Sequence, residues 1–375
     1  MQPIQMVNLT TQYERIQPAM DKAVLDVIRS GQYINGEAVS ALAEELRLYT
    51  GTKYVIPCAN GTDALQIALM ALELQPGDEV IVPAFTYAAC AEAAALLQLR
   101  PVVVDVDPKT FNINVQKIEE AISPKTKAII PVHLFGQTAD MEPLMEIAQK
   151  HHLYVVEDNA QSIGSIYTFS NGVQKQAGTI GDVGTLSFFP TKNLGCYGDG
   201  GALLTDNESL AGQLQMIALH GQSQKYRHER IGCNSRLDTL QAAILRVKLQ
   251  HLASFVFARR KAASAYDVGL KTLSWIETPT CLPASTHVYH QYTLKVKDGQ
   301  RDNLRQYLKT QGIPTMIYYP FPLQEQPAFR NIVRTVGDLS ETEALCRSVL
   351  SLPMHTELDD EQIATIVEKI TSYTC

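Results

Sequence analysis

Seven short apolar runs, separated by helical patterns, constrain the fold of this chain more than any other feature. The runs lie between Lys53 and Thr205 and read KYVIPC, DEVIVP, PVVVDV, KAIIPV, LYVVED, GTLSF and GALLT. Helical patterns fall between them at Thr62–Leu74, Tyr87–Leu97, Val115–Ala121 and Met141–Lys150. Strands that are apolar throughout must be covered on both faces, so the pattern predicts a largely parallel sheet between layers of helices. The fold class is therefore α/β.

The rest of the chain indicates a second, smaller domain. A long helical pattern from Ser235 to Leu270 leads into a segment with one β-rich run, HQYTLKV, and helical patterns near Arg301–Gln311 and Asp360–Ser372. We predict a large domain over residues 1–245 and a small C-terminal α/β domain over residues 246–375.

The N-terminal helix of the large domain is predicted at Ala19–Ser30, where Gly31 follows as a C-cap glycine would.

Charge and apolar content exclude several classes of function. The formal net charge of -7 argues against broad binding to nucleic acid or to an anionic membrane, while small anionic ligands stay compatible with it. The longest apolar stretch, Glu79–Leu97, contains Pro83 and Glu92, and the first twenty residues lack the pattern of a secretory signal. We therefore expect a cytoplasmic protein.

Cysteine usage fits the same expectation. The seven cysteines are scattered and form no C-x-x-C pair, which favours reduced thiols over a disulfide framework, and no metal site is predicted. We expect Cys196 to be a packed small residue because no histidine lies near it in sequence. The cysteines are Cys58, Cys90, Cys196, Cys233, Cys281, Cys346 and Cys375.

In a parallel sheet, ligands bind beyond the carboxyl ends of the strands, and the first strand-end feature is an anion site. The motif CANGTDAL places Gly61 and Thr62 between a strand and a helix. Backbone N–H groups and a hydroxyl at a helix N-terminus suit a phosphate. The structural alternative is that Thr62 is the N-cap and Gly61 a turn residue.

A second feature is the motif VVEDNAQ, which ends an apolar strand with Glu157 and Asp158. Carboxylates there require a positive or hydrogen-bonding partner. Asp158 is suited to a protonated ring nitrogen, and Gln161 is placed to reach the same ligand. Alternatively, Asp158 caps the following turn.

Two further strand ends carry an aromatic ring and an amine. Tyr87 is predicted at the start of a helix, where its ring could lie against a planar ligand, although a core tyrosine is the common alternative. Ser187 and Lys192 follow the run GTLSF in the motif SFFPTKNLGCYGDGG. Ser187 offers a further phosphate donor and Lys192 an amine that can form an imine.

A phosphate site, a carboxylate for a ring nitrogen, a stacking ring and a lysine are together the contacts that pyridoxal phosphate requires. In this interpretation Lys192 holds the coenzyme as a Schiff base and Asp158 keeps the pyridine protonated. Lys192, once released, moves the proton between the substrate carbon and the coenzyme.

The motifs NGTDAL, VVEDNAQSIGS, SFFPTKNLGCYGDGG, RIGCNSRLDTLQAAIL and LSLPMH together resemble the DegT/DnrJ/EryC1/StrS family of nucleotide-sugar aminotransferases. The resemblance runs from GQYING to LSLPMHTELDDEQI. It implies the type I aminotransferase fold, a homodimer with both active sites at the interface, and glutamate as amino donor with 2-oxoglutarate as its product.

The resemblance also assigns roles to residues. Lys192 is similar to the Schiff-base lysine, Asp158 to the pyridinium partner, and Gln161 to the contact on the ring hydroxyl side. The remaining coenzyme contacts are the stacking Tyr87, the phosphate-binding Thr62 and Ser187, and Asn234, which would reach the phosphate of the other subunit.

The substrate contacts implied by the resemblance come from the segments SGQYING, CNSRLD and PTMIYYPFPL, and they are Gly31, Tyr33, Arg236, Tyr318 and Tyr319. The most similar group makes a 3-amino sugar from a UDP-3-keto-N-acetylglucuronate. Relatives of that group often carry histidine where this chain has Tyr318, so a neutral phenol replaces a group that could contact an anionic sugar. UDP-3-keto-N-acetylglucosamine is therefore an equal candidate.

The expected function is amino transfer from glutamate to a UDP-linked keto sugar, for cell-surface polysaccharide or lipopolysaccharide biosynthesis. A UDP-4-keto-sugar aminotransferase is the alternative enzyme, and a non-catalytic, coenzyme-binding regulatory protein is the alternative from another class. Sugar dehydratases of the family replace the lysine with histidine, so Lys192 argues against them. We expect His133 and His220 to be structural or to lie at the substrate rim.

Overall fold

The computed structural model describes residues 3–374, and its main feature is a sheet of eight strands in the order β1-β9-β8-β5-β4-β2-β3-β14. All seven predicted runs form strands of this sheet. The strands are β1 (Tyr54–Cys58), β2 (Glu79–Pro83), β3 (Arg100–Val104), β4 (Thr126–Ile129), β5 (Tyr154–Asp158), β8 (Val183–Ser187), β9 (Gly201–Thr205) and β14 (Arg334–Thr335).

The prediction of a largely parallel sheet is confirmed, with β9 as the exception. β9 pairs antiparallel with β8 on one side and with β1 on the other, whereas the pairs among β5, β4, β2 and β3 are parallel. β8 pairs parallel with β5, so the carboxyl ends of β2, β4, β5 and β8 meet at one edge of the sheet. The strand-end residues are therefore collected there.

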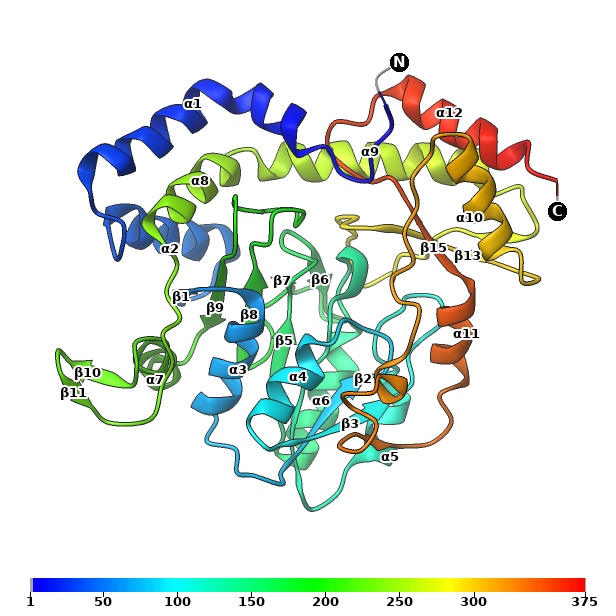
Figure 1. Cartoon of the computed structure of the whole chain (residues 1–375). Coiled ribbons are helices and arrows are strands. Elements are labelled where there is room, and N and C mark those ends of the chain that lie inside the picture. The colour runs from blue at the N-terminus through cyan, green and yellow to red at the C-terminus, as the bar shows by residue number, and fades with distance from the viewer. Residues whose placement is uncertain (1–2, 375) are drawn as a thin grey trace.

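Helices cover both faces of the sheet, as Figure 1 shows. One apolar cluster joins the sheet to α3 (Gly61–Ala71), α4 (Ala89–Leu96) and α7 (Glu208–Ala218). Another cluster joins it to α5 (Ile118–Ala121) and α6 (Met141–His151). Packing of apolar strands between these layers removes both sheet faces from water, which is the dominant stabilising contribution in such a fold.

The N-terminal helices pack with the middle of the chain. α1 (Leu9–Ser30) is longer than predicted and ends at Gly31, whose φ of 67° confirms the predicted C-cap. α1 and α2 (Glu37–Thr50) form an apolar cluster with α8 (Thr239–Leu249).

The single helix predicted over Ser235–Leu270 is wrong in detail. The helix begins at Thr239 and is broken at Gln250 and His251, after which α9 (Leu252–Leu270) continues. The break separates two packing environments, since α8 belongs to the cluster of α1 and α2 whereas most of α9 packs in a third cluster.

The third cluster includes residues of a three-stranded sheet in the order β12-β13-β15. In Figure 1, α10 and α12 lie near the C-terminal end of α9, and they belong to the same cluster. Residue 245 lies inside α8, and β14 joins the large sheet from the C-terminal part, so the division at 245/246 stays a prediction. The elements are β12 (Ile276–Glu277), β13 (Tyr292–Val296), α10 (Arg301–Thr310), α11 (Ser340–Ser348), β15 (Val349–Leu352) and α12 (Asp360–Thr371).

Within residues 3–374, two hairpins and three short 3-10 helices complete the set of elements. The hairpin of β10 (Gln222–Gln224) and β11 (Arg227–His228) projects from the side of the molecule that carries α7 (Figure 1). The other elements are β6 (Ile166–Thr168), β7 (Gln174–Gln176), η1 (Val115–Lys117), η2 (Leu134–Gly136) and η3 (Leu323–Glu325).

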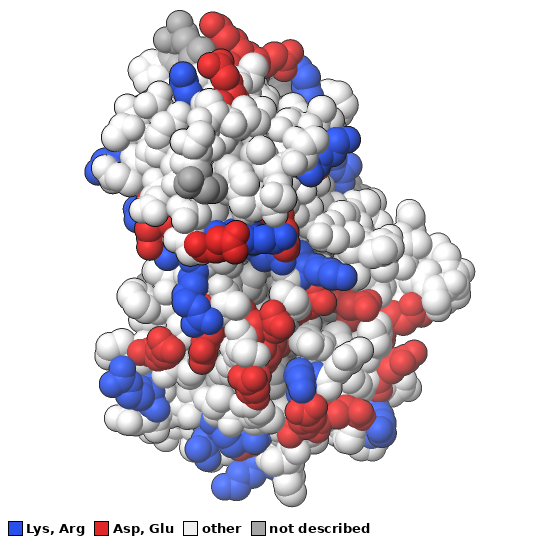
Figure 2. Space-filling view, turned by 90° about the vertical axis from the view of Figure 1, so that its right-hand side faces the viewer, with Lys and Arg blue, Asp and Glu red and all other residues white. Residues whose placement is uncertain are grey.

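The surface has no continuous patch of one charge on the face drawn in Figure 2, where acidic and basic side chains are interspersed. Within residues 3–374, no helix is both long and apolar enough to cross a membrane. The six cysteines in this part of the chain are free thiols, and Cys375 lies outside the described residues. Cys196 is buried and packed, as predicted, with its thiol donating to the carbonyls of Phe188 and Gly198.

Candidate active site

Asp158 is the last residue of β5, and its carboxylate is almost fully buried at the carboxyl edge of the sheet, with 7% of its surface exposed. The Oδ2 atom accepts a hydrogen bond from the thiol of Cys90, 3.1 Å away. The Oδ1 atom accepts the backbone N–H of Ala160 at 3.1 Å, so the turn-capping alternative is also correct. The hydrogen bonds from Cys90 and Ala160 thus fix the orientation of the Asp158 carboxylate.

The predicted phosphate site is built from the start of α3 and the end of β8. A Cβ atom added to Gly61 would lie 2.7 Å from Cβ of Ser187, so only glycine permits this approach. The N-cap of α3 is Asn60, whose side chain accepts the N–H of Asp63 at 2.8 Å. The alternative with Thr62 as N-cap is therefore wrong, and Thr62 lies in the first turn, where backbone N–H groups suit a phosphate.

Lys192 follows β8 in the loop after Ser187, and its backbone N–H donates to the carbonyl of Phe189 at 2.9 Å. The residue keeps some exposed surface, yet burial lowers the pKa of its amine from the ordinary 10.5 to about 8. The charge of Asp158 acts on the same amine and opposes the shift. A lysine near this pKa is neutral in a useful fraction at physiological pH and can act as a nucleophile.

Aromatic side chains gather around Tyr319, which lies within electrostatic range of Asp158. Tyr319 packs against Tyr87, with ring centroids 6.2 Å apart, and against Phe85 at 5.9 Å. Gln161 donates through Nε2 to the hydroxyl of Tyr319 at 3.3 Å and accepts the N–H of Phe135 at 2.8 Å. Burial raises the pKa of Tyr319, so its phenol is neutral.

Tyr87 lies before α4 and not within it, because that helix begins at Ala89, so its predicted place at a helix start is wrong by two residues. Its ring is 61% exposed. The predicted alternative of a core tyrosine is thereby excluded. An exposed ring that packs against Tyr319 at this edge of the sheet is suited to stacking on a planar ligand.

These residues fit pyridoxal phosphate on observations of the chain itself. The close approach at Gly61 leaves N–H groups and the Ser187 hydroxyl for a phosphate, and Asp158 offers an anionic acceptor for a ring N–H. Lys192 offers the amine. No group of three His, Cys, Asp or Glu side chains within residues 3–374 is arranged to hold a metal ion.

The predicted substrate contacts fall into two groups. Tyr318 and Tyr319 lie with Gln161 and Tyr87, and the rings of Tyr318 and Tyr319 are 6.0 Å apart. In the described chain, no hydrogen bond or ring contact links Gly31, Tyr33 or Arg236 to that group. Gly31 ends α1, and the carbonyl of Tyr33 accepts the N–H of Thr239 at 2.9 Å.

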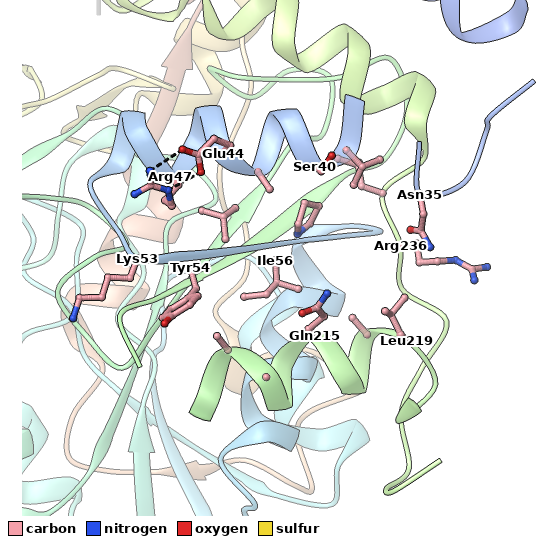
Figure 3. A pocket seen from close by; sticks show the side chains of 18 of the residues that line it. Asn35, Ser40, Glu44, Arg47, Lys53, Tyr54, Ile56, Gln215, Leu219 and Arg236 are labelled. Atoms are coloured by element: carbon pink, nitrogen blue, oxygen red, sulfur yellow. Dashed lines mark hydrogen bonds and ion pairs between the residues drawn. The ribbon is translucent and has the colours of Figure 1, made fainter. Parts of the chain in front are cut away.

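Arg236 lines a pocket of about 690 Å³ between α2 and α7, beside the edge strand β1. Figure 3 shows Asn35 and Arg236 at one end of this pocket and Lys53 at the other. Lys192 is not among the residues that line this pocket, so Arg236 lies in a hollow separate from the amine. Asn234 is exposed and precedes Ser235, whose hydroxyl accepts the N–H of Ala59 at 3.0 Å just before α3.

Two residues at the site, Cys90 and His290, were not among the contacts predicted from the sequence. Cys90 bonds to Asp158 from α4, and the position of α4 directly after a strand end was the available signal. His290 is buried, and its pKa is well below the usual value because of burial and of the charges on Lys192 and Arg259. Its Nδ1 has no partner within the described residues, and no sequence signal placed it beside Lys192.

Comparison with known proteins agrees with this geometry. The model of the DegT/DnrJ/EryC1/StrS aminotransferase family matches residues 14–371. The chain is 46% identical to the UDP-2-acetamido-2-deoxy-3-oxo-D-glucuronate aminotransferase of Pseudomonas aeruginosa, over 98% of this chain and 100% of the relative. It is 42% identical to the UDP-N-acetyl-3-dehydro-alpha-D-glucosamine 3-aminotransferase of Acidithiobacillus ferrooxidans, over 98% and 97%.

A third relative carries a different kind of name. A protein of Geobacillus stearothermophilus described as a pleiotropic regulatory protein is 46% identical, over 99% of this chain and 98% of the relative.

Solved structures give the same fold. The DesV protein of S. venezuelae in complex with a ketimine intermediate superposes with a TM-score of 0.94 at 37% identity, over 100% of each chain. The NtdA protein of Bacillus subtilis with bound cofactor PMP gives a TM-score of 0.87 at 34% identity, over 95% of this chain and 81% of that one. The predicted aminotransferase fold and coenzyme are confirmed, and the chain belongs to the DegT/DnrJ/EryC1/StrS aminotransferase family of pyridoxal-phosphate-dependent enzymes.

Proposed function

We propose that this enzyme transfers the amino group of glutamate to the keto carbon of UDP-3-keto-N-acetylglucosamine or of its uronate, with 2-oxoglutarate as the second product. The names of two relatives, one acting on a 3-oxo-glucuronate and one on a 3-dehydro-glucosamine, support a UDP-linked 3-keto sugar. A UDP-4-keto sugar is the alternative substrate.

The observation that supports catalysis is that the amine of Lys192, whose pKa burial lowers to about 8, lies within electrostatic range of the Asp158 carboxylate. Pyridoxal phosphate supplies an aldehyde and an electron-withdrawing ring when it is bound. Lys192 offers the amine that holds the aldehyde and, when free, takes and returns the proton of the reacting carbon. Asp158 would offer its buried carboxylate to the ring N–H of the bound coenzyme, and the exposed Tyr87 would offer its ring for stacking.

Tyr318 bears on the choice between the neutral sugar and the uronate. Burial raises the pKa of Tyr318, so this position carries no charge that could pair with a sugar carboxylate. The identities to the two kinds of enzyme are similar, 46% and 42%, so the proposal includes both sugars. Arg236 is the cationic group that we propose for the diphosphate, since a guanidinium pairs well with phosphate oxygens.

A homodimer with shared sites is part of the proposal. It is supported by the division of the candidate substrate residues into two groups and by exposed apolar side chains around α1 and the β10–β11 hairpin. Asn35 and Gln224 line one pocket, which places the segment between α1 and α2 beside that hairpin. The exposed apolar residues are Leu25, Ile28, Tyr33, Ile34, Tyr226 and Ile231.

We further propose a cytoplasmic location, in line with the free thiols of the described cysteines, and a role in cell-surface polysaccharide or lipopolysaccharide biosynthesis.

A regulatory protein that binds the coenzyme without turnover is the competing function, and the name of the Geobacillus relative favours it. The presence of both Lys192 and Asp158 favours catalysis. A loss of visible absorbance upon adding glutamate to the loaded protein would support catalysis, whereas an unchanged spectrum would support the regulatory function.

The sugar is tested by running the reaction in reverse. Purified enzyme is given 2-oxoglutarate and a panel of UDP-3-amino and UDP-4-amino sugars, and glutamate formation is measured, with K192A as the inactive control. We expect turnover with a UDP-3-amino-N-acetyl sugar. Failure with every 3-amino sugar would overturn the proposed regiochemistry. The Y318H variant should increase the preference for the uronate.

A further inference from the structure

Glu157 precedes Asp158 in β5, yet its carboxylate belongs to a separate, fully buried cluster. Successive side chains of a strand point to opposite faces, so Glu157 and Asp158 project away from each other. Glu157 and His133 both have 0% of their surface exposed. The proposed chemistry uses neither of them, so a buried carboxylate beside the reactive site needs another explanation.

The carboxylate of Glu157 accepts four hydrogen bonds. Its Oε2 atom lies 2.8 Å from Nε2 of His133 and 2.9 Å from the N–H of Gly178. Its Oε1 atom accepts the N–H groups of Ile180 and Gly181, each at 2.6 Å. Burial alone would raise the pKa of Glu157, but the bonds from His133, Gly181 and Gly178 hold it below its usual value. The group is a buried anion in a complete shell of donors.

His133 is oriented so that it donates to this anion. Its Nδ1 accepts the N–H of Ala139 at 3.1 Å, so the ring proton is on Nε2, which faces Glu157. The backbone of His133 also holds the end of β5, because its N–H donates to the carbonyl of Asp158 at 3.0 Å. The N–H of Asp158 in turn donates to the carbonyl of Pro131 at 2.9 Å.

Three segments that carry coenzyme contacts converge on this pair. The segment after His133 contains Phe135, whose N–H donates to Gln161. The turn at residues 178–181, held by Glu157, leads directly into β8, which ends at Ser187 and precedes Lys192. The backbone of Glu157 continues into Asp158. Movement of Glu157 or His133 would therefore displace Asp158, Ser187 and Gln161 together.

We propose that Glu157 and His133 form a positioning pair that sets the geometry of Asp158, Gln161 and Ser187 around the coenzyme. Residues that hydrogen-bond to the contact residues of a binding site often affect ligand affinity nearly as strongly as the contact residues do. The inference rests on coenzyme binding and goes beyond the proposed function, because it holds for any sugar substrate.

Glu79 provides a matched control. It is also a buried carboxylate with several donors, since it accepts Ser123 Oγ at 2.6 Å and pairs with Arg334 at 2.9 Å. It is the first residue of β2, so it lies at the amino end of the sheet, opposite the coenzyme site. E157Q and E79Q each put an amide NH2 group where a buried carboxylate oxygen accepted hydrogen bonds. Only E157Q disturbs the groups that we propose to position Asp158.

The test measures coenzyme affinity, the visible absorbance band of bound coenzyme, and thermal unfolding of the coenzyme-free protein, all without sugar. E157Q should weaken coenzyme affinity roughly tenfold or more and shift the band. E79Q should lower thermal stability while keeping the affinity and the band of the wild type. Wild-type affinity and spectrum in E157Q, or equal losses in E79Q, would overturn the proposal.

A pair of variants at His133 keeps the test decisive if E157Q does not fold. H133Q retains an N–H donor at the reach of Nε2, whereas H133N retains only a group at the position of Nδ1. We expect H133Q to restore most of the coenzyme affinity that H133N loses. Equal behaviour of the two variants would show that the hydrogen bond to Glu157 has no positioning role. Absence of sugar turnover by the wild type would affect the proposed function alone.

Discussion

Gly61 at the start of α3 and Ser187 at the end of β8 approach so closely that a Cβ atom added to Gly61 would lie 2.7 Å from Cβ of Ser187. Real Cβ atoms essentially never approach another heavy atom this closely. The contact brings the N–H groups of a helix start together with a strand-end hydroxyl, which is the arrangement that a phosphate requires. Coenzyme binding therefore depends on the absence of a side chain at residue 61.

Gly61→Ala should weaken coenzyme affinity about tenfold or more, equivalent to ~1.4 kcal/mol, because the helix and strand must separate. The measurement is a titration of the coenzyme-free protein with pyridoxal phosphate. Gly212→Ala is the control, since Gly212 lies within α7 and an added Cβ would meet nothing within 4 Å. Equal affinity of the two variants would contradict the assigned phosphate site.

Cys90→Ala should lower kcat/KM about tenfold, because the hydrogen bond to the charged Asp158 carboxylate is lost. Cys90→Ser keeps a donor and should retain most of the activity. Cys346→Ala, at a buried cysteine of α11, controls for the loss of thiol volume. If Cys90→Ser is as impaired as Cys90→Ala, packing and not hydrogen bonding explains the role of Cys90.

The amine of Lys192 should become reactive at a lower pH than an ordinary lysine. In the coenzyme-free protein, reductive methylation of Lys192, followed by mass spectrometry of its peptide, should rise with a midpoint near pH 8, because burial lowers its pKa to about 8. Asp158→Asn removes the charge that raises this pKa, so its midpoint should fall further. A midpoint near the ordinary value of 10.5 would contradict the burial of the amine.

The same shift predicts a pH dependence of stability. The folded-state pKa of Lys192 lies below that of the unfolded chain, so the unfolded chain binds more protons between about pH 8 and pH 10.5. The free energy of unfolding of the wild type, relative to Lys192→Met, should therefore rise with pH across that window. Denaturant titrations of both coenzyme-free proteins at several pH values measure it.

Shared active sites predict complementation between two inactive variants. If Asn234 acts on the coenzyme of the partner and Lys192 acts in its own subunit, each variant alone is impaired. A mixed dimer of Lys192→Ala and Asn234→Ala then contains one site with both wild-type residues. Refolding an equal mixture should recover about a quarter of wild-type activity, from half the dimers with one good site each. No recovery would contradict the sharing.

The strands and most helices could be predicted because burial on both sheet faces selects continuous apolar runs. The direction of β9 could not, since an apolar run has the same composition in either direction. The break of the helix at Gln250 and His251 carries no Pro or Gly signal and follows from packing against two different clusters.

At the site, the sequence identified residues that face a ligand but not their supports. Asp158 ends a strand, and Gln161 and Lys192 lie in loops shortly after strands, so all three could be found by their position at strand ends. Two of the supporting contacts join residues far apart in sequence: the hydrogen bond of Cys90 to Asp158 and the pair of Glu157 with His133. The spacing of residues along the chain therefore does not predict them. Thr62 and Asn60 are both good caps, and only the geometry of α3 distinguishes them.

The proposed chemistry depends most directly on which lysine holds the coenzyme. Lys192 and Lys248 both have a pKa lowered to about 8 by burial, so amine reactivity alone does not separate them. The protein loaded with pyridoxal phosphate is reduced with borohydride, digested and analysed by mass spectrometry. We predict a single pyridoxyl group on Lys192, whereas a pyridoxyl group on Lys248 with Lys192 unmodified would contradict the assignment of Lys192 as the Schiff-base lysine.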